Sequence, residues 1–366
     1  MSKKAFPHIF SFILPLLGVL AMLFLFPENT LPEPVLELIS TIDIPENEYS
    51  ADSQTGQTEP ADALVPFFLE EETGGVFGYL NRNNRLVRSG RAVFGCTISG
   101  TGYIVFPKVP DSLAINNPDG SPAATISGTG YPRYFAAGKR LFVFTSDLTG
   151  LREINSAGIT IWRRNIPSWI TSVSANQEIV VVGLSSGACL LLGKNGEIIR
   201  EMAAGESRIA CIYGTSCEQI GTRYAVLSGA GPHRIAVMEA STGELVFKTE
   251  LPDLARTEKR MLFSSCRRYL FVEGDDSVFI IDLAEKKVDT IFLPGRLIAF
   301  SYSKDSGILV LLARRGENLE LSGLRPPRAL VFRTAYPSVS RFLYTDAGLI
   351  AAGRNNQISF FNTGEE

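Results

Sequence analysis

The stretch YFAAGKRLFVF at 134–144, followed by NSAGITIW at 155–162, carries the pattern that decides the fold. In both stretches, short runs of apolar and β-branched residues stand on either side of a small polar turn, which is the pattern of a β-hairpin. Two successive hairpins make one antiparallel sheet of four strands. No convincing amphipathic helix is found from residue 64 onward, so we predict an all-β body.

The first hairpin occurs seven times at a spacing of about forty residues. The second hairpin follows each copy, and its turns are centred near Gly120, Gly158, Gly196, Gly243, Lys286, Pro327 and Gly364. A single four-stranded sheet cannot bury both of its faces, so the sheets must stack around an axis. The repeats therefore predict a single β-propeller of four-stranded antiparallel blades at 64–366.

Seven copies of the hairpin favour seven blades. The chain ends shortly after QISFFNT at 357–363, the expected third strand of the last blade, so one outer strand is missing there. Additional strands can be formed by the segment at 66–90, PFFLEEETGGVFGYLNRNNRLVRSG, which lies before the seven repeats. We expect one of them to complete the last blade and close the ring. If this segment instead forms a blade of its own, the count becomes eight.

The N-terminal segment, residues 1–29, predicts a short cytoplasmic stub and one transmembrane signal-anchor helix. Lys3 and Lys4 precede an apolar run of eighteen residues from Ile9 to Phe26, which as a helix would reach about 27 Å, close to the thickness of the hydrocarbon core. Because the positive charge lies only before the run, we expect the N-terminus to stay cytoplasmic and the body to cross the membrane. Residues 5–26 would then lie in the inner (cytoplasmic) membrane, with the propeller in the periplasm. The alternative is a signal peptide cleaved near Ala21, which also exports the body.

An acidic, Pro-containing linker is predicted at 30–63. Residues 27–62 carry nine Asp and Glu but no Lys or Arg, and five prolines interrupt them. Such a composition favours an extended, solvated spacer. One apolar patch, Val35 to Ile44, could instead dock as a short helix or strand on the body or on a partner.

The turns that contain glycine are followed by apolar strands, as in Gly158–Trp162 (GITIW), GEII at 196–199 and GELVF at 243–247. These repeats resemble the bacterial propellers related to quinoprotein alcohol dehydrogenases and the WD40-like group, over residues 64–366. The Gly-His and Trp-Asp pairs of true WD40 repeats are absent, and one blade alone has the Trp of the quinoprotein repeat. The resemblance therefore implies the scaffold and transfers no function.

Several signals for chemistry are weak in this chain. The stretch GLSSG at 183–187 matches a hydrolase motif, but it lies between two apolar strands and predicts a hairpin turn. Quinoprotein dehydrogenases use adjacent cysteines and a Trp-lined cofactor floor, and this chain has neither a Cys-Cys pair nor more than two Trp. His, Cys and carboxylate residues show no metal-ligand spacing. We expect no catalytic residue, no cofactor and no metal.

Two groups of residues remain as candidates. Arg82, Arg85, Arg88 and Arg91 recur at every third position and could contact an anionic surface or partner, although ordinary solubilising charge explains them as well. Cys211 and Cys217 are close enough in sequence for a disulfide across a loop, whereas burial as free thiols is the alternative.

Together these patterns predict a membrane-anchored, extracytoplasmic propeller that serves as a non-enzymatic scaffold for protein–protein interaction in a cell-envelope complex. Its expected partners are envelope proteins, and export argues against nucleic acid. The alternative is a propeller enzyme, or a sensor of a small ligand or glycan, that uses the central funnel. That alternative requires carboxylate, Tyr or Arg side chains to converge at one mouth of the funnel.

Overall fold

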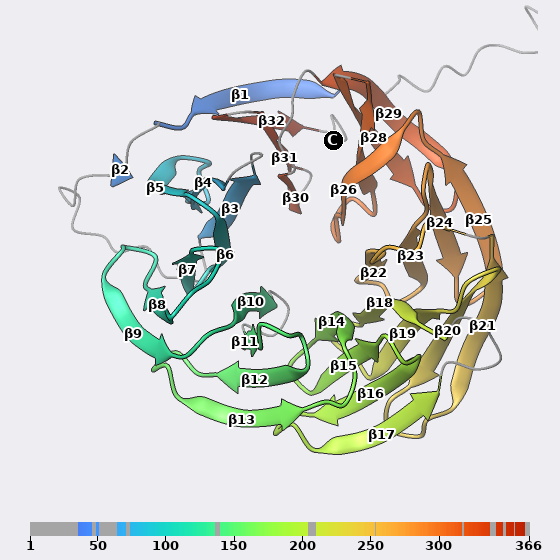
Figure 1. Ribbon diagram of the computed structural model, residues 1–366. Coiled ribbons are helices and arrows are strands. Elements are labelled where there is room, and N and C mark those ends of the chain that lie inside the picture. The colour runs from blue at the N-terminus through green and yellow to red at the C-terminus, as the bar shows by residue number, and fades with distance from the viewer. Residues whose placement is uncertain are drawn as a thin grey trace, which may run out of the picture. The chain divides into compact units, whose positions relative to one another are not determined.

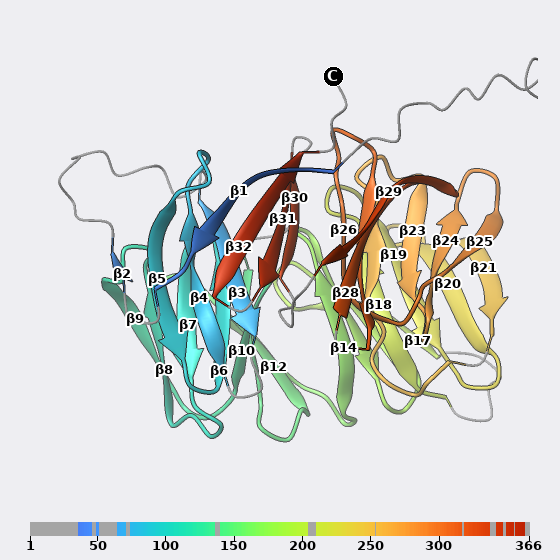
Figure 2. The same ribbon diagram turned by 90° about the horizontal axis from the view of Figure 1, so that it is seen from above.

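The strands form a ring of four-stranded antiparallel sheets around a common axis (Figure 1). The computed structural model of the protein describes residues 36–45, 49–50, 64–70, 74–135, 140–203, 210–252, 254–316, 318–336, 342–346, 349–354 and 356–362. Within these residues there are eight such sheets. Figure 2 shows the ring from the side, with the strands standing roughly along its axis. The prediction of an all-β, four-stranded propeller is confirmed.

The first four blades, given from the innermost strand outward, have the following bounds. Blade 1 contains β3 (Val65–Glu70), β4 (Gly75–Leu80), β5 (Leu86–Ala92) and β2 (Tyr49–Ser50). Blade 2 contains β6 (Gly95–Ser99), β7 (Gly102–Phe106), β8 (Ser112–Asn116) and β9 (Pro122–Ser127). Blade 3 contains β10 (Tyr131–Phe135), β11 (Arg140–Phe144), β12 (Gly150–Ile154) and β13 (Thr160–Asn165). Blade 4 contains β14 (Ile170–Ala175), β15 (Ile179–Leu184), β16 (Ala188–Gly193) and β17 (Ile198–Ala203).

The remaining four blades follow the same order and complete the ring. Blade 5 contains β18 (Ile212–Cys217), β19 (Arg223–Ser228), β20 (His233–Glu239) and β21 (Leu245–Leu251). Blade 6 contains β22 (Met261–Phe263), β23 (Tyr269–Glu273), β24 (Ser277–Asp282) and β25 (Lys287–Phe292). Blade 7 contains β26 (Arg296–Tyr302), β27 (Leu309–Arg315), β28 (Asn318–Arg325) and β29 (Ala329–Tyr336). Blade 8 contains β30 (Leu343–Asp346), β31 (Leu349–Arg354), β32 (Gln357–Asn362) and β1 (Glu37–Asp43).

The favoured count of seven blades is wrong, and the alternative of eight holds. The segment at 66–90 forms a blade of its own from strands β3, β4 and β5, and the short strand β2 pairs with β5 as its outer strand. This blade lacks the second hairpin of the repeat, because its outer strand comes from upstream and is only two residues long.

The ring is closed by β1, which pairs antiparallel with β32 from Glu37 opposite Asn362 to Asp43 opposite Gln357. The expected mechanism of closure, an N-terminal strand that completes the last blade, is therefore confirmed, but the strand is not the one expected. It lies inside the predicted linker, so for these residues the prediction of a solvated spacer is wrong, and the alternative that the apolar patch docks as a strand on the body holds. The strand carries a weak signal because it is outermost and mostly exposed. Ile44, just after it, is 3% exposed and anchors it to the core.

The predicted transmembrane helix at 1–29 lies outside the described residues. Within the residues described above, no helix has the length and apolar character needed to span a bilayer.

Each interface between adjacent blades holds its own apolar cluster. Blades 8 and 1, for example, share a cluster that contains Phe67, Leu69 and Phe360, and the seven other interfaces are filled in the same way. The second strand of most blades is covered on both faces, which explains uninterrupted apolar runs such as IVVVGL in β15. Every blade therefore depends on two neighbours for burial.

A buried polar network ties blade 3 to blade 4. Arg140 forms an ion pair with Glu153, with an Nη2–Oε2 distance of 2.5 Å, and both side chains are 7% exposed. The Arg140 Nη1 group also donates to the Asn176 carbonyl in blade 4 (2.9 Å), and the Trp162 indole donates to Glu153 (2.6 Å). The Trp162 ring lies against Gly196, where an added Cβ would approach ring atoms to 2.4 Å. Trp162, the single Trp at the repeat position, thus packs between blades 3 and 4.

We expect closure by β1 to control stability. A protein that begins at residue 36 should melt at the temperature of the full-length chain, whereas one that begins at residue 64 should melt about 5 °C lower or more. The second protein loses β1, β2 and the buried Ile44, and it exposes the edge of β32. Melting followed by circular dichroism measures the difference, and equal melting temperatures for the two proteins would contradict the role of β1.

Candidate functional site

The two ends of the ring differ in the connections that they carry. We call the end at which the innermost strands of blades 2 to 8 begin the loop face, and the opposite end the turn face. In an antiparallel blade, the connection from the second to the third strand and the link to the next blade both lie on the loop face. The connections of 107–111, 145–149 and 166–169, and residues 254–260 of the link before β22, therefore gather there.

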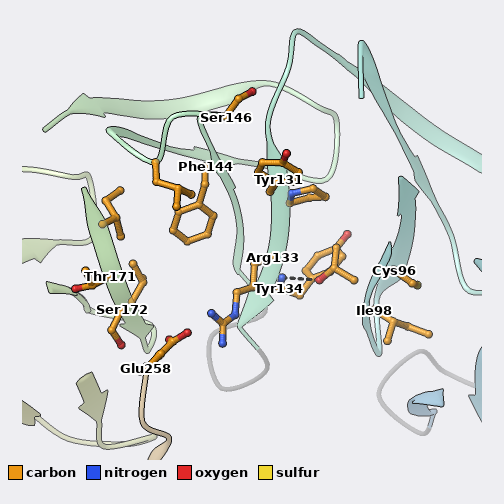
Figure 3. A pocket seen from close by; sticks show the side chains of 15 residues that line it. Cys96, Ile98, Tyr131, Arg133, Tyr134, Phe144, Ser146, Thr171, Ser172 and Glu258 are labelled. Carbon is orange, nitrogen blue, oxygen red and sulfur yellow. Dashed lines mark hydrogen bonds between the residues drawn. The ribbon is translucent and has the colours of Figure 1, made fainter. Parts of the chain in front are cut away.

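A cavity of about 670 Å³ opens at the loop face, beside the axis of the ring. Its wall comes from three innermost strands, β6, β10 and β14, together with the end of β11, the connection after it and the link before β22 (Figure 3). We call it the funnel pocket, and its lining residues are Cys96, Thr97, Ile98, Tyr131, Pro132, Arg133, Tyr134, Phe144, Ser146, Leu148, Ile170, Thr171, Ser172, Val173 and Glu258.

Two hydroxyl residues of this wall tie neighbouring innermost strands together. The Thr97 hydroxyl accepts a hydrogen bond from the Tyr134 amide (2.9 Å), which joins β6 to β10. The Ser172 hydroxyl lies 3.0 Å from that of Thr215 and accepts from the Thr215 amide at 3.1 Å, which joins β14 to β18. These hydroxyls therefore hold the shape of the channel wall.

The charges of the funnel pocket are those of Arg133 and Glu258. Burial raises the pKa of Cys96 to about 12, and burial with the nearby Cys96 raises the pKa of Tyr134 to about 12, so both are neutral at physiological pH. Arg133 is exposed on β10, with its guanidinium 5.4 Å from the centre of the Phe135 ring. Figure 3 shows Arg133 and Glu258 pointing into the same space from opposite sides.

Glu258 reaches the funnel pocket because the link between β21 and β22 is anchored on both sides of it. The Lys259 ammonium lies 2.6 Å from the Asp275 carboxylate, which also accepts from the Ala255 amide. The Leu254 amide donates to His233 Nδ1 (3.2 Å). Partial burial opposes ionisation of Asp275, but its bonds to Lys259 and Ala255 hold its pKa below the usual value.

Sequence reasoning missed Arg133 and Glu258. His233, which bonds to the link that carries Glu258, lies fully buried at the start of β20. One signal was available for the link, because the turn centres Gly243 and Lys286 lie 43 residues apart instead of 38. The additional residues of this repeat include the link that carries Glu258.

The four candidate arginines are not brought together. Arg82 and Arg85 lie in or beside the turn between β4 and β5, on the turn face, whereas Arg91 lies near the loop-face end of β5. Arg88 is half-buried and donates through Nη1 to the Asp119 carbonyl of blade 2 (2.6 Å). There its guanidinium fills the space beside Gly120, where an added Cβ would approach it to 2.2 Å, and the φ of +87° at Gly120 also disfavours any other residue. Arg88 thus occupies an interblade position like that of Trp162.

The candidate disulfide between Cys211 and Cys217 is absent, and both thiols are free. The reason is geometric, because β18 runs as an extended strand between them. At ~3.3 Å per residue their Cα atoms are roughly 20 Å apart, far beyond the ~7 Å that a disulfide can bridge.

The stretch at 183–187 is the hairpin turn between β15 and β16, closed by the Gly187 amide bonding to the Leu184 carbonyl (3.1 Å). Within the described part of the chain, no three His, Cys, Asp or Glu side chains are grouped so that they could hold a metal ion.

Comparisons with known proteins agree with the fold. A family model described as "beta-propeller protein" matches residues 1–364. A protein of Treponema pallidum (strain Nichols), which bears the name "Uncharacterized protein", is 22% identical over 273 residues, covering 74% of this chain and 70% of that protein. The crystal structure of BamB from Moraxella catarrhalis is similar with a TM-score of 0.61 at 11% identity, covering 90% of this chain and 100% of that chain. At such low identity the structural likeness concerns the fold alone.

The free cysteines predict the outcome of thiol labelling. After unfolding without reductant, alkylation should add five labels, one for each Cys of the sequence. In the folded protein, Cys266 should react first, because it is exposed and its pKa lies below the usual value of 9.0. Partial burial disfavours its thiolate, but bonds to Ser264, the Arg268 backbone and Tyr302 stabilise the thiolate and lower the pKa. Its labelling rate should therefore reach half its maximum below pH 9.

Cys189 is the internal control for this experiment. It is buried, and burial raises its pKa to about 12, so it should be labelled only after unfolding. Mass spectrometry counts and locates the labels. Three labels after unfolding without reductant would show that a disulfide exists.

Proposed function

Because the chain belongs to the β-propeller protein family, we propose that it is a non-enzymatic platform that binds protein partners, anchored in the inner membrane and displayed in the periplasm. The observation that carries this proposal is a group of exposed apolar side chains on the loop face. We call this group the apolar rim, and its members are Val93, Phe94, Val109, Leu148 and Trp169.

The apolar rim follows the loop face across blades 1 to 4. Val93 and Phe94 connect β5 to β6, Val109 follows β7, Leu148 follows β11 and Trp169 precedes β14. Val93 is 85% exposed, Val109 69% and Trp169 66%.

Contacts place Phe94 on neighbouring rings at the loop face, and they place Leu148 beside Trp169. The rings of Phe94 and Phe106 lie 6.5 Å apart, and those of Phe106 and Tyr131 also lie 6.5 Å apart. The Ile170 amide donates to the Leu148 carbonyl (2.8 Å), which places Trp169 beside Leu148. Clustered exposure of large apolar and aromatic side chains is typical of a protein-binding surface.

Basic side chains border the apolar rim. Arg91 and Lys108 are exposed next to Val93 and Val109. A partner surface with apolar residues surrounded by acids would be complementary to this arrangement, which keeps an anionic partner in the proposal although the four arginines do not form one patch.

A second candidate function, binding of a small ligand in the funnel, is favoured by the presence of Arg133, Glu258 and two tyrosines in one pocket. The proposal for the platform does not depend on it, because the apolar rim lies outside the pocket except at Leu148.

The anchor can be tested by fractionation of cells. The full chain should stay with the inner membrane after an alkaline carbonate wash, whereas a protein lacking residues 1–29 should be soluble, because the apolar run from Ile9 to Phe26 supplies the membrane affinity. The intact mass of the purified protein decides the alternative. A mature chain that begins after Ala21 would show that the segment is a cleaved signal peptide.

The apolar rim can be tested with a photo-crosslinking amino acid in intact cells. Placed at Val109, it should give discrete adducts with one or a few envelope proteins, and the Trp169→Ser change should reduce their yield at least tenfold with the melting temperature unchanged. Ile220, which is 76% exposed on the turn face, is the matched control position and should give no such adduct. Equal adducts from both positions, or none from Val109, would exclude the rim as the binding surface.

A further inference from the structure

Arg133 and Glu258 are opposite charges that face one cavity without pairing. Both side chains line the funnel pocket and are exposed to it (Figure 3). Among the residues that the structure describes, neither forms an ion pair with the other or with any third residue, in contrast to the pairs formed by Arg140, Lys259 and Arg268 elsewhere. The pocket therefore offers one cation and one anion that form no ion pair with described residues.

The rest of the wall is suited to an apolar group. Phe144, Ile170 and Val173 contribute carbon surface, and Tyr131 stands at the mouth with its hydroxyl already bonded to the Lys108 carbonyl (3.2 Å). The volume of about 670 Å³ lies within the range of small-ligand sites, roughly 300–1,000 Å³. A ligand that fills this pocket needs an apolar body as well as charged ends.

We propose that the funnel pocket binds a zwitterionic ligand of the short-peptide class. Its carboxylate would pair with Arg133, its ammonium group with Glu258, and an apolar side chain would lie against Phe144 and Ile170. The choice of class follows from the two charges. A simple anion would meet the repulsion of Glu258, a simple cation that of Arg133, and a neutral glycan would form an ion pair with neither charge.

The anchoring of the link makes the site ready for this ligand. Lys259, next to Glu258 in the chain, is 5% exposed and held by Asp275, and its amide donates to the Tyr213 carbonyl (2.7 Å). On the other side of the pocket, the Tyr134 amide next to Arg133 is held by Thr97. Because the backbone at both charges is already fixed, little ordering is needed when the ligand binds.

The test uses the tripeptide Ala-Phe-Ala as a probe, with free ends, with an acetylated N-terminus, or with an amidated C-terminus. Calorimetry on the full-length protein in detergent should show that the free peptide binds about tenfold or more tightly than either blocked peptide, as expected for the loss of one charge-assisted bond. Arg133→Gln should weaken binding of the free peptide about tenfold and make amidation of no consequence. Glu258→Gln should do the same for acetylation.

Arg82→Gln, on the turn face, is the matched control and should leave all three affinities unchanged. Because Arg133 and Glu258 are exposed, their variants should keep the melting temperature, so that a loss of binding is not a loss of folding. The proposal is overturned if the free peptide fails to bind at millimolar concentration, if the three peptides bind equally, or if neutral maltotriose binds more tightly than the free peptide. None of these results depends on the apolar rim. A failure of peptide binding in the funnel pocket would therefore leave the proposed binding of protein partners untouched, and the reverse also holds.

Discussion

The pairing of β1 with β32 is the constraint on which the rest of the ring depends. Each blade buries its apolar faces only against its two neighbours, and the eighth interface, between blades 8 and 1, joins the two ends of the ring. Because β1 and β2 belong to neighbouring blades and are separated by a few residues, the N-terminal part of the body spans this interface. The chain thus uses one short segment to complete two blades.

Closure also determines where the functional surfaces lie. A closed ring fixes the rotation from each blade to the next, so residues about one repeat apart arrive at the same height on the channel wall. This is how Thr97 meets the Tyr134 amide and how Ser172 meets Thr215. The same rotation gathers the connections of blades 1 to 4 on the loop face, where the apolar rim borders the mouth of the funnel pocket.

Much of the fold could be predicted from hydrophobic patterning, because blades repeat and their middle strands are covered on both faces. The IVVVGL run of β15 is buried throughout, and such runs marked seven of the eight blades. Blade 1 was not counted although its β4 is buried throughout, because its outer strand, β2, comes from upstream and has two residues. The apolar patch that contains β1 could be seen in the sequence, but its pairing with β32 could not.

By itself, the sequence determined the all-β class, the four-stranded repeat, the need for an N-terminal strand to close the ring, and the hairpin turn at 183–187. These features depend on the local alternation of apolar and polar residues and on turn residues. Only the tertiary structure decided the blade count, the separation of Cys211 from Cys217, the interblade role of Arg88 and the convergence of Arg133 with Glu258. Those features depend on which residues meet across blades. Contacts between blades are set by strand register and by the rotation from one blade to the next about the axis. A linear pattern of polar and apolar residues does not contain this information.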